Sequence, residues 1–237
     1  ATLQLNGEVL ADLFMGRVKS WNDTRIAALN PGLALPAVPV KRVVRAEKSG
    51  TSDGFSRYLA GASAAFKAEV GAGQAPAWPG EPLKAEGNDG MVQTLRATPG
   101  AIAYVSYDRV LRDKLAAVKL RNAAGHFIAP SERGFSAAVL ESDMHRQGDD
   151  LATLLDRPGA DAWPITLTSF VLVDAEPVEA AKAQGALKFL YWCFMHGDDL
   201  TRGSGFAPLP VSVQSRLAAR FTQVRPRDGR LPAYQSF

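Results

Sequence analysis

The sequence predicts an α/β fold, and three observations support this prediction. Apolar residues recur alternately at helical spacing and in short β-branched runs, so helices and strands alternate along the 237 residues. Hydrophobic residues make up 46% of the chain and charged residues 22%, a balance typical of globular proteins that build a core without disulfides or metal. No apolar run approaches the roughly 18–20 residues that span a bilayer.

The first half of the chain predicts short elements separated by glycine and proline. Val40–Arg45 is β-branched and predicts a strand. Apolar residues at helical spacing after Thr51 predict one helix that reaches Phe66. The segment 71–86 is rich in Gly, Pro and Ala and is expected to form a loop. The other elements expected here are an extended stub at 3–5, helices at 8–14, 24–29 and 87–98, and a strand at 101–107.

The second half continues the alternation. The segments 118–120 and 126–128 flank a turn with glycine and predict a hairpin. Ile165–Val173 is a strongly β-prone run and predicts a strand. Pro177 suits the first turn of a long helix that is expected to reach His196. Further helices are expected at 131–144, 151–155 and 211–221.

The stretch from Arg45 to Thr51 carries a binding chemistry. It places an arginine at a strand end and Ser49, Gly50 and Thr51 at the start of the next helix. Backbone N–H groups in a first helical turn point outward, and the helix dipole adds positive potential, so this position favours an anion. Gly50 permits close backbone approach, and the neighbouring hydroxyls can donate hydrogen bonds. Arg45 can present its planar guanidinium to a tetrahedral oxyanion, with Glu47 placed to hold it.

Ordinary structural roles also fit these residues. A Ser or Thr before a helix is commonly only a cap, and an arginine at a strand end is commonly a solvated charge. Asn88, at the start of a predicted helix, is interpreted in the same way as a cap, with a ligand contact as the alternative. Phosphoester hydrolysis at Ser49 has less support, because Lys48-Ser49-Gly50 lacks the first glycine of a nucleophile elbow and no histidine lies nearby.

Other functional classes have little support in the sequence. Twenty-seven Lys and Arg against 24 Asp and Glu leave a net charge of +3, and the basic residues are scattered apart from a modest C-terminal group, so nucleic-acid binding is not expected. Cys193 is the one cysteine and lies in an apolar run, which predicts a buried thiol. The three histidines lie far apart, so neither a metal site nor a cofactor is expected.

Several sequence blocks resemble the phosphate-binding proteins of high-affinity phosphate ABC transporters. They occur in the order of that family across nearly the whole chain, a combination far more specific than any single motif. The blocks are Ala11–Asp23, Ile26–Gly32, Arg45 with Ser49-Gly50-Thr51, Gly87–Gly90, Thr98–Val105, Asp161–Thr166 and Pro208–Pro210.

The resemblance implies a periplasmic-binding-protein-like fold of type II, in which two α/β lobes joined by crossing strands close on a dehydrated phosphate. Carried over by position, Arg45, Ser49, Gly50 and Thr51 form the second lobe's half of the phosphate site, with Arg45 as its one cationic contact. The resemblance also implies a periplasmic substrate-binding protein without catalytic activity, with its signal peptide removed and an ABC permease as partner.

The resemblance further implies that part of the first lobe is missing from this chain. Members of the family begin with a Gly-rich segment that supplies the opposing ligands, including an aspartate that accepts a proton from phosphate. By the family's layout, residues 8–162 form one complete lobe with the half-site, whereas 1–7 and 163–237 are hinge strands and the C-terminal part of the other lobe. Apolar faces in that part, including those of Phe189 and Trp192, would lack partners. We therefore expect another chain or a swapped copy to complete the lobe, or else a truncated form of the protein.

Two functions from different classes follow from these observations. The first is binding of inorganic phosphate for import, through Arg45 and the Ser49-Gly50-Thr51 helix start. The alternative is a truncated or diverged member of the family that acts as an interaction or scaffold protein and does not bind phosphate competently.

Overall fold

The structure is a computed structural model that describes residues 2–228. Residue 1 and residues 229–237, the ends of the two outer segments assigned above to the other lobe, lie outside the described residues. The helices are α1 (Gly7–Phe14), α2 (Thr24–Leu29), α3 (Gly50–Ala62), α4 (Ala64–Glu69), α5 (Gly87–Ala97), α6 (Tyr107–Arg112), α7 (Glu132–Leu140), α8 (Asp143–Arg146), α9 (Ala180–Thr201), α10 (Val211–Ala219) and the 3-10 helix η1 (Arg220–Gln223). The strands are β1 (Gln4–Leu5), β2 (Lys41–Arg45), β3 (Leu83–Ala85), β4 (Ala101–Ile102), β5 (Lys119–Arg121) and β6 (Phe127–Ile128).

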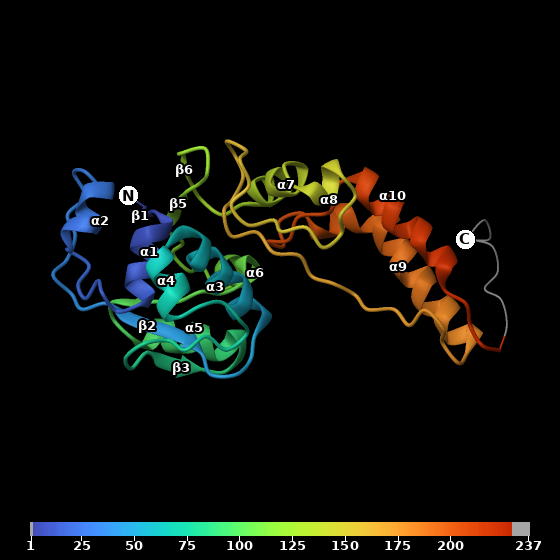
Figure 1. Ribbon diagram of the computed structural model, residues 1–237, viewed down its shortest axis with the longest axis horizontal. Helices are drawn as coiled ribbons and strands as arrows, with labels where there is room; N and C mark the ends of the chain where they lie inside the picture. The colour runs from blue at the N-terminus through green and yellow to red at the C-terminus, as the bar shows by residue number, and fades with distance from the viewer. Residues whose placement is uncertain (1, 229–237) are drawn as a thin grey trace.

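The molecule consists of a rounded body, which contains α1–α6 and all six strands, and an arm, which contains α7–α10 (Figure 1). Two three-stranded sheets lie in the body, with strand orders β3-β2-β4 and β1-β5-β6. The central strand β2 runs parallel to both its neighbours, and β1 runs parallel to β5. Helices and strands alternate through the body, so the predicted α/β class is confirmed.

The body is held together by one hydrophobic core. Helix α1 packs on α3 so closely that a Cβ added at Gly7 would lie 2.5 Å from the Cβ of Ala62. Aromatic rings fill the space between these helices and the β2 sheet: Phe55 stacks on Tyr104 with centroids 4.5 Å apart, and Phe14 meets Phe55 edge to face at 4.7 Å. This packing fixes the start of α3 relative to the end of β2.

Most of the expected elements in the body are present, and the differences have local causes. The single helix expected up to Phe66 is divided, because the Ser63 hydroxyl accepts from the N–H of Phe66 and caps a new helix, α4. The expected loop at 71–86 contains β3, which pairs with β2. The strand expected at 101–107 ends at Ile102, and helix α6 begins at Tyr107. The helix expected at 131–144 is divided into α7 and α8.

Two predictions in the second half are wrong. The expected helix at 151–155 does not form, and residues 152–154 have no regular secondary structure, although Leu154 is buried. The expected strand at 165–173 is extended but unpaired, and Leu172 is 95% exposed. Its β-branched and aromatic residues favour a sheet, but no strand lies beside them in the part of the chain that the structure describes, so no ladder forms.

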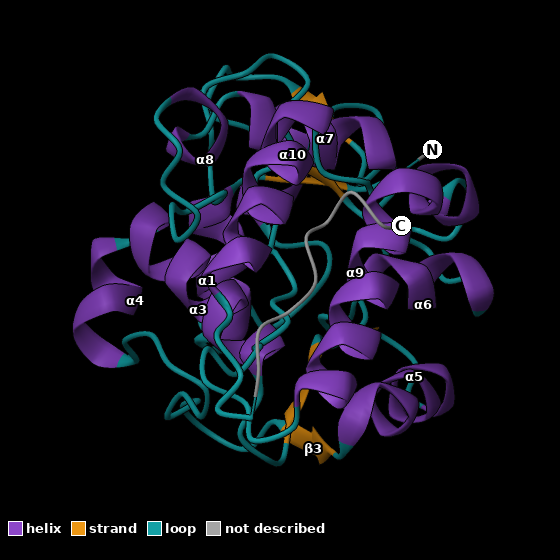
Figure 2. Cartoon of the chain, turned by 90° about the vertical axis from the view of Figure 1, so that its right-hand side faces the viewer, coloured by secondary structure: helices purple, strands orange, loops and turns teal. Residues whose placement is uncertain are grey.

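The arm has a small core of its own and a large exposed apolar surface. Its core is formed by Val139, Met144, Leu154 and Val213. Figure 2 looks along the arm from its free end, with α9 and α10 toward the viewer. The long helix α9 begins at Ala180, so Pro177 precedes the helix and is not in its first turn as expected. It ends at Thr201, beyond the expected His196, and only Ala183 and Leu187 of it are buried. Cys193, expected to be buried, is only partly buried. No helix among the described residues is long and apolar enough to cross a bilayer.

The exposed apolar residues concentrate in the arm and in the extended segment that leads to it. Those from the segment through α10 are Leu167, Phe170, Val171, Leu172, Val173, Val178, Phe189, Trp192, Met195, Leu200, Phe206 and Val211. So many exposed apolar residues in one part of a chain are unusual for a monomer in water.

Candidate anion-binding site

The predicted site lies where two parallel strands end and two helices begin. Strand β2 ends at Arg45, and α3 begins five residues later at Gly50. Strand β3 pairs in parallel with β2 and ends at Ala85, and α5 begins at Gly87. The carboxyl ends of parallel strands meet at one edge of a sheet, the usual position of ligand sites in α/β folds. The topology therefore brings two helix N-termini to the end of β2.

Arg45 is held at this edge by partners on two sides. Its side chain is 13% exposed. Its Nε donates to Glu47 Oε1 at 2.6 Å, and its Nη2 pairs with the same oxygen. Its Nη1 lies 3.5 Å from Asn88 Oδ1. Three of the five guanidinium N–H groups are thereby engaged, which leaves donors at Nη1 and Nη2 for an oxyanion.

The carboxylate of Glu47 fixes both the arginine and the second helix. It accepts the Arg45 hydrogen bonds, and it also accepts from the backbone N–H of Gly87 at 3.2 Å. The hydrogen bond from Arg45, with a smaller contribution from Gly87, lowers the pKa of Glu47 below its usual value. The predicted role of Glu47 as the group that holds the guanidinium is confirmed by this geometry.

Ser49, Gly50 and Thr51 form the first turn of α3. The Ser49 hydroxyl accepts from the N–H groups of Thr51 at 3.2 Å and Ser52 at 3.4 Å, so it is the helix cap. Capping uses the oxygen lone pairs and leaves the hydroxyl proton able to donate, so the structural role and an anion-binding role are compatible. Gly50 is exposed, and a Cβ added to it would meet no atom within 4 Å.

Tyr104 connects the end of β2 to the first turn of α3, and the sequence alone did not predict this role. Its hydroxyl accepts from the backbone N–H of Arg45 at 3.1 Å and lies 2.7 Å from Ser52 Oγ. Burial raises the pKa of Tyr104, so the phenol stays protonated and can serve both contacts. The one signal in the sequence is the position of Tyr104 within the family-like block at 98–105.

Asn88 is not the cap that the sequence suggested. The N-cap residue of α5 is Glu86, and no side chain caps it. The Asn88 side chain instead lies between Arg45 and Ser106, with its Nδ2 3.4 Å from Ser106 Oγ.

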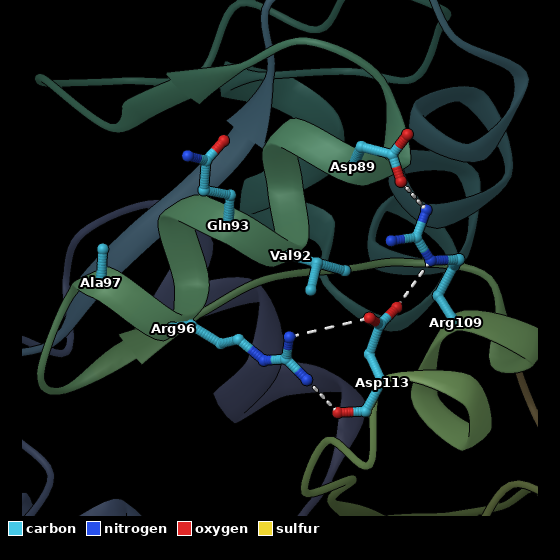
Figure 3. A pocket seen from close by; sticks show the side chains of 7 residues that line it. All are labelled: Asp89, Val92, Gln93, Arg96, Ala97, Arg109 and Asp113. Carbon is cyan, nitrogen blue, oxygen red and sulfur yellow. Dashed lines mark hydrogen bonds and ion pairs between the residues drawn. The ribbon is translucent and has the colours of Figure 1, made fainter.

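A neighbouring groove between α5 and α6 is lined by charged side chains that pair with one another. It is lined by Asp89, Val92, Gln93, Arg96, Ala97, Arg109 and Asp113 (Figure 3). Arg109 pairs with Asp113 at 2.8 Å and also with Asp89, and Arg96 reaches Asp113. Hydrogen bonding from Arg109 lowers the pKa of Asp113. Arg112 also reaches both aspartates, at 3.7 Å and 3.9 Å, so the carboxylates of this groove are engaged by arginines of α5 and α6.

The described residues contain no group of three or more His, Cys, Asp or Glu side chains that could hold a metal ion. The donors at the Arg45 edge are N–H and O–H groups, which suit an anion.

A protein-family model, that of the PBP superfamily domain, matches residues 1–195. Among curated proteins, the phosphate-binding protein PstS of Xylella fastidiosa (strain Temecula1) is 36% identical over 217 residues, and the PstS of Haemophilus influenzae is 34% identical over 220 residues. Each alignment covers 92% of this chain. It covers 59% of the X. fastidiosa protein and 65% of the H. influenzae protein, so the chain spans less than two thirds of these relatives.

Solved structures show the same fold. A phosphate-binding protein from Stenotrophomonas maltophilia superposes with a TM-score of 0.66 at 20% identity, covering 93% of this chain and 65% of that one. A DING protein superposes with a TM-score of 0.64 at 19% identity, covering 95% of this chain and 73% of that one. At these identities the likeness concerns the fold.

Proposed function

The chain belongs to the PBP superfamily, and on that premise we propose that it binds inorganic phosphate as the substrate-binding component of an ABC phosphate importer. The type II periplasmic-binding-protein-like fold expected from the sequence is confirmed by the family match and the superpositions. The relatives are phosphate-binding proteins by name, and the proposal carries that activity over to this chain.

One observation carries the proposal: a largely buried guanidinium with unused donors lies beside an open helix start. Arg45 is held by Glu47 at 2.6 Å, and Gly50 in the adjoining turn is exposed. A small tetrahedral oxyanion can accept from Arg45, from the Ser49 and Thr51 hydroxyls and from backbone N–H groups of the first turn. Each of these contacts is a hydrogen bond, which suits reversible capture better than catalysis.

The setting of this activity is part of the proposal. Substrate-binding proteins of ABC importers work in the periplasm and deliver their ligand to a membrane permease. We place this chain there, with the ABC permease of the phosphate importer as its partner, and assign it no catalytic step.

The proposal includes the lobe organisation. We assign residues 8–162 to one complete lobe, which carries Arg45, and we assign 1–7 and 163–237 to hinge strands and the C-terminal part of the other lobe. The exposed apolar surface of the arm, with Phe189 64% and Leu172 95% exposed, supports a further chain segment as its cover, supplied by another chain or by a swapped copy.

Calorimetric titration with phosphate and with sulfate tests the assignment. Arg45→Ala removes a charge-assisted contact and is expected to weaken phosphate binding by about 10- to 100-fold. Arg57→Ala is the matched control, because the Arg57 side chain lies on α3, is 61% exposed and pairs with Asp53 of the same helix. Equal phosphate affinity in the Arg45 variant and the parent protein would overturn the assignment.

The same titration distinguishes phosphate binding from the alternative function. An interaction or scaffold protein would show no phosphate binding in the parent chain while still associating through the arm. The exposed arm is the observation that favours this alternative.

A further inference from the structure

Asn88 is a polar residue at the site edge that neither capping nor the assigned ligand set explains. It is the second residue of α5, where it caps nothing. Its side chain is half-buried between Arg45, at the end of β2, and Ser106, just before α6. We infer that Asn88 is a positioning residue for Arg45: it restrains the guanidinium on the side opposite Glu47. This inference rests on the proposed function.

The contacts of Arg45 define what Asn88 can do. Glu47 engages Nε and Nη2, which are on one edge of the guanidinium, whereas Asn88 Oδ1 approaches Nη1 at 3.5 Å. Glu47 alone leaves the plane of the group free to swing about that edge. A second acceptor at Nη1 limits this swing, so the remaining N–H groups keep one direction. A planar donor set binds an oxyanion well only when its orientation is fixed.

The amide of Asn88 is itself oriented by a second partner. Its Nδ2 donates to Ser106 Oγ at 3.4 Å. Ser106 precedes α6 but makes no capping hydrogen bond, so its hydroxyl is available for this contact. With the NH₂ group directed to Ser106, the carbonyl oxygen of Asn88 faces Arg45.

The backbone that carries Asn88 is fixed on both sides. The preceding Gly87 donates its N–H to Glu47 at 3.2 Å. The following Asp89 pairs with Arg109 of α6, a side chain that is only 9% exposed. The start of α5 is therefore joined to both β2 and α6, and Asn88 lies between these two attachments.

A double-mutant cycle tests the inference. Asn88→Ala is expected to weaken phosphate binding about fivefold to tenfold in the parent protein. In an Arg45→Lys background the Nη1 donor no longer exists, so Asn88→Ala is expected to change the affinity by less than about twofold. Gln93→Ala, an exposed amide on the same helix, is the control and is expected to have no effect in either background. An equal loss in both backgrounds, or no loss in the parent protein, would overturn the positioning role.

A second readout needs no phosphate. The ¹⁵N-detected Nε–H signal of Arg45 is expected to shift or broaden in Asn88→Ala and to stay unchanged in Gln93→Ala. If no protein in the series binds phosphate, the proposed function fails, and this signal alone decides the inference. An Nε–H signal identical in the parent protein and Asn88→Ala would contradict it.

Discussion

At the scale of single residues, the site depends on how one arginine is held. Arg45 has a carboxylate on one edge and an amide near the other, and its backbone N–H is bound by Tyr104. Glu47 neutralises part of the arginine's charge and at the same time fixes its direction. A site for one small anion needs one oriented arginine and a helix start rather than a basic surface, which agrees with the small net charge of +3.

The Glu47–Arg45 pair predicts a specific pH dependence of stability. Arg45 lowers the pKa of Glu47 in the folded protein below its ordinary value of 4.5, so the pair stabilises the fold above that pH. This contribution is lost as the pH falls through the lowered pKa. Glu47→Gln is expected to be less stable than the parent protein at pH 7 and to approach it below pH 4.5, in urea unfolding curves. A difference that stays constant across this range would contradict the role of the pair.

Tyr104 gives a second prediction at this scale. Tyr104→Phe removes the acceptor for the Arg45 N–H and the partner of Ser52 within a buried region. The expected cost is about 1–3 kcal/mol in the free energy of unfolding, measured by urea denaturation, because polar groups are left unsatisfied. Tyr107→Phe provides a comparison on the neighbouring helix, and an equal cost there would contradict the linking role of Tyr104.

At the scale of elements, glycines and caps determine where the helices and strands lie. Gly100 is the clearest case: its φ is +76°, and a Cβ there would lie 2.5 Å from the carbonyl oxygen of Pro39. Its own carbonyl accepts from Lys41 and from the Trp21 indole, so this turn joins β4 to β2. A change there displaces the sheet that carries Arg45.

Two glycine substitutions with different expected effects on stability test the role of Gly100. Gly100→Ala is expected to destabilise the protein by about 2–4 kcal/mol, through the positive φ and the backbone contact. Gly61→Ala, at a position in α3 where a Cβ meets nothing within 4 Å, is expected to be neutral or to stabilise by up to about 1 kcal/mol. Thermal unfolding of both variants measures the difference, and similar melting temperatures would contradict the assigned constraint.

Local signals in the sequence predicted the elements whose causes are local. The strand that ends at Arg45, the cap at Ser49 and the start of the helix that follows were predicted correctly, because hydrogen-bonding side chains and apolar spacing lie within a few residues. The predicted end of that helix at Phe66 was wrong, since α3 ends at Ala62. Strand β3 was missed, since three residues in a Gly- and Pro-rich stretch are paired only through β2, about forty residues away. The contacts of Tyr104 and Asn88 were missed for the same reason, because their partners lie far away in the sequence.

At the scale of the whole molecule, the body and the arm differ in how completely they bury apolar surface. The body encloses a continuous core, whereas the arm exposes Phe189 and the segment at 167–173. The strand predicted at 165–173 does not form, because a β-strand must pair with a neighbouring strand and β-propensity alone does not provide one. The same residues would suit a sheet if another chain segment paired with them.

Limited proteolysis tests this difference. Among the described residues, the backbone of 167–173 makes no backbone–backbone hydrogen bond, and Phe170 and Leu172 are 60% and 95% exposed. Chymotrypsin is expected to cut first after Phe170 or Leu172 and to leave a resistant fragment that contains the body. A first cut within the body would contradict this division. If a second copy covers the segment, the cleavage rate falls as the protein concentration rises, and a concentration-independent rate would contradict that form of cover.

The central claim is that phosphate binds at Arg45 and the first turn of α3, and an amide NMR titration tests it most directly. On addition of phosphate, the backbone amides of Gly50 and Thr51 and the Nε–H of Arg45 are expected to shift together with one dissociation constant, and Arg45→Ala is expected to abolish the shifts. Shifts confined to other surfaces, such as the groove at Arg109, or no shift at millimolar phosphate, would contradict the claim.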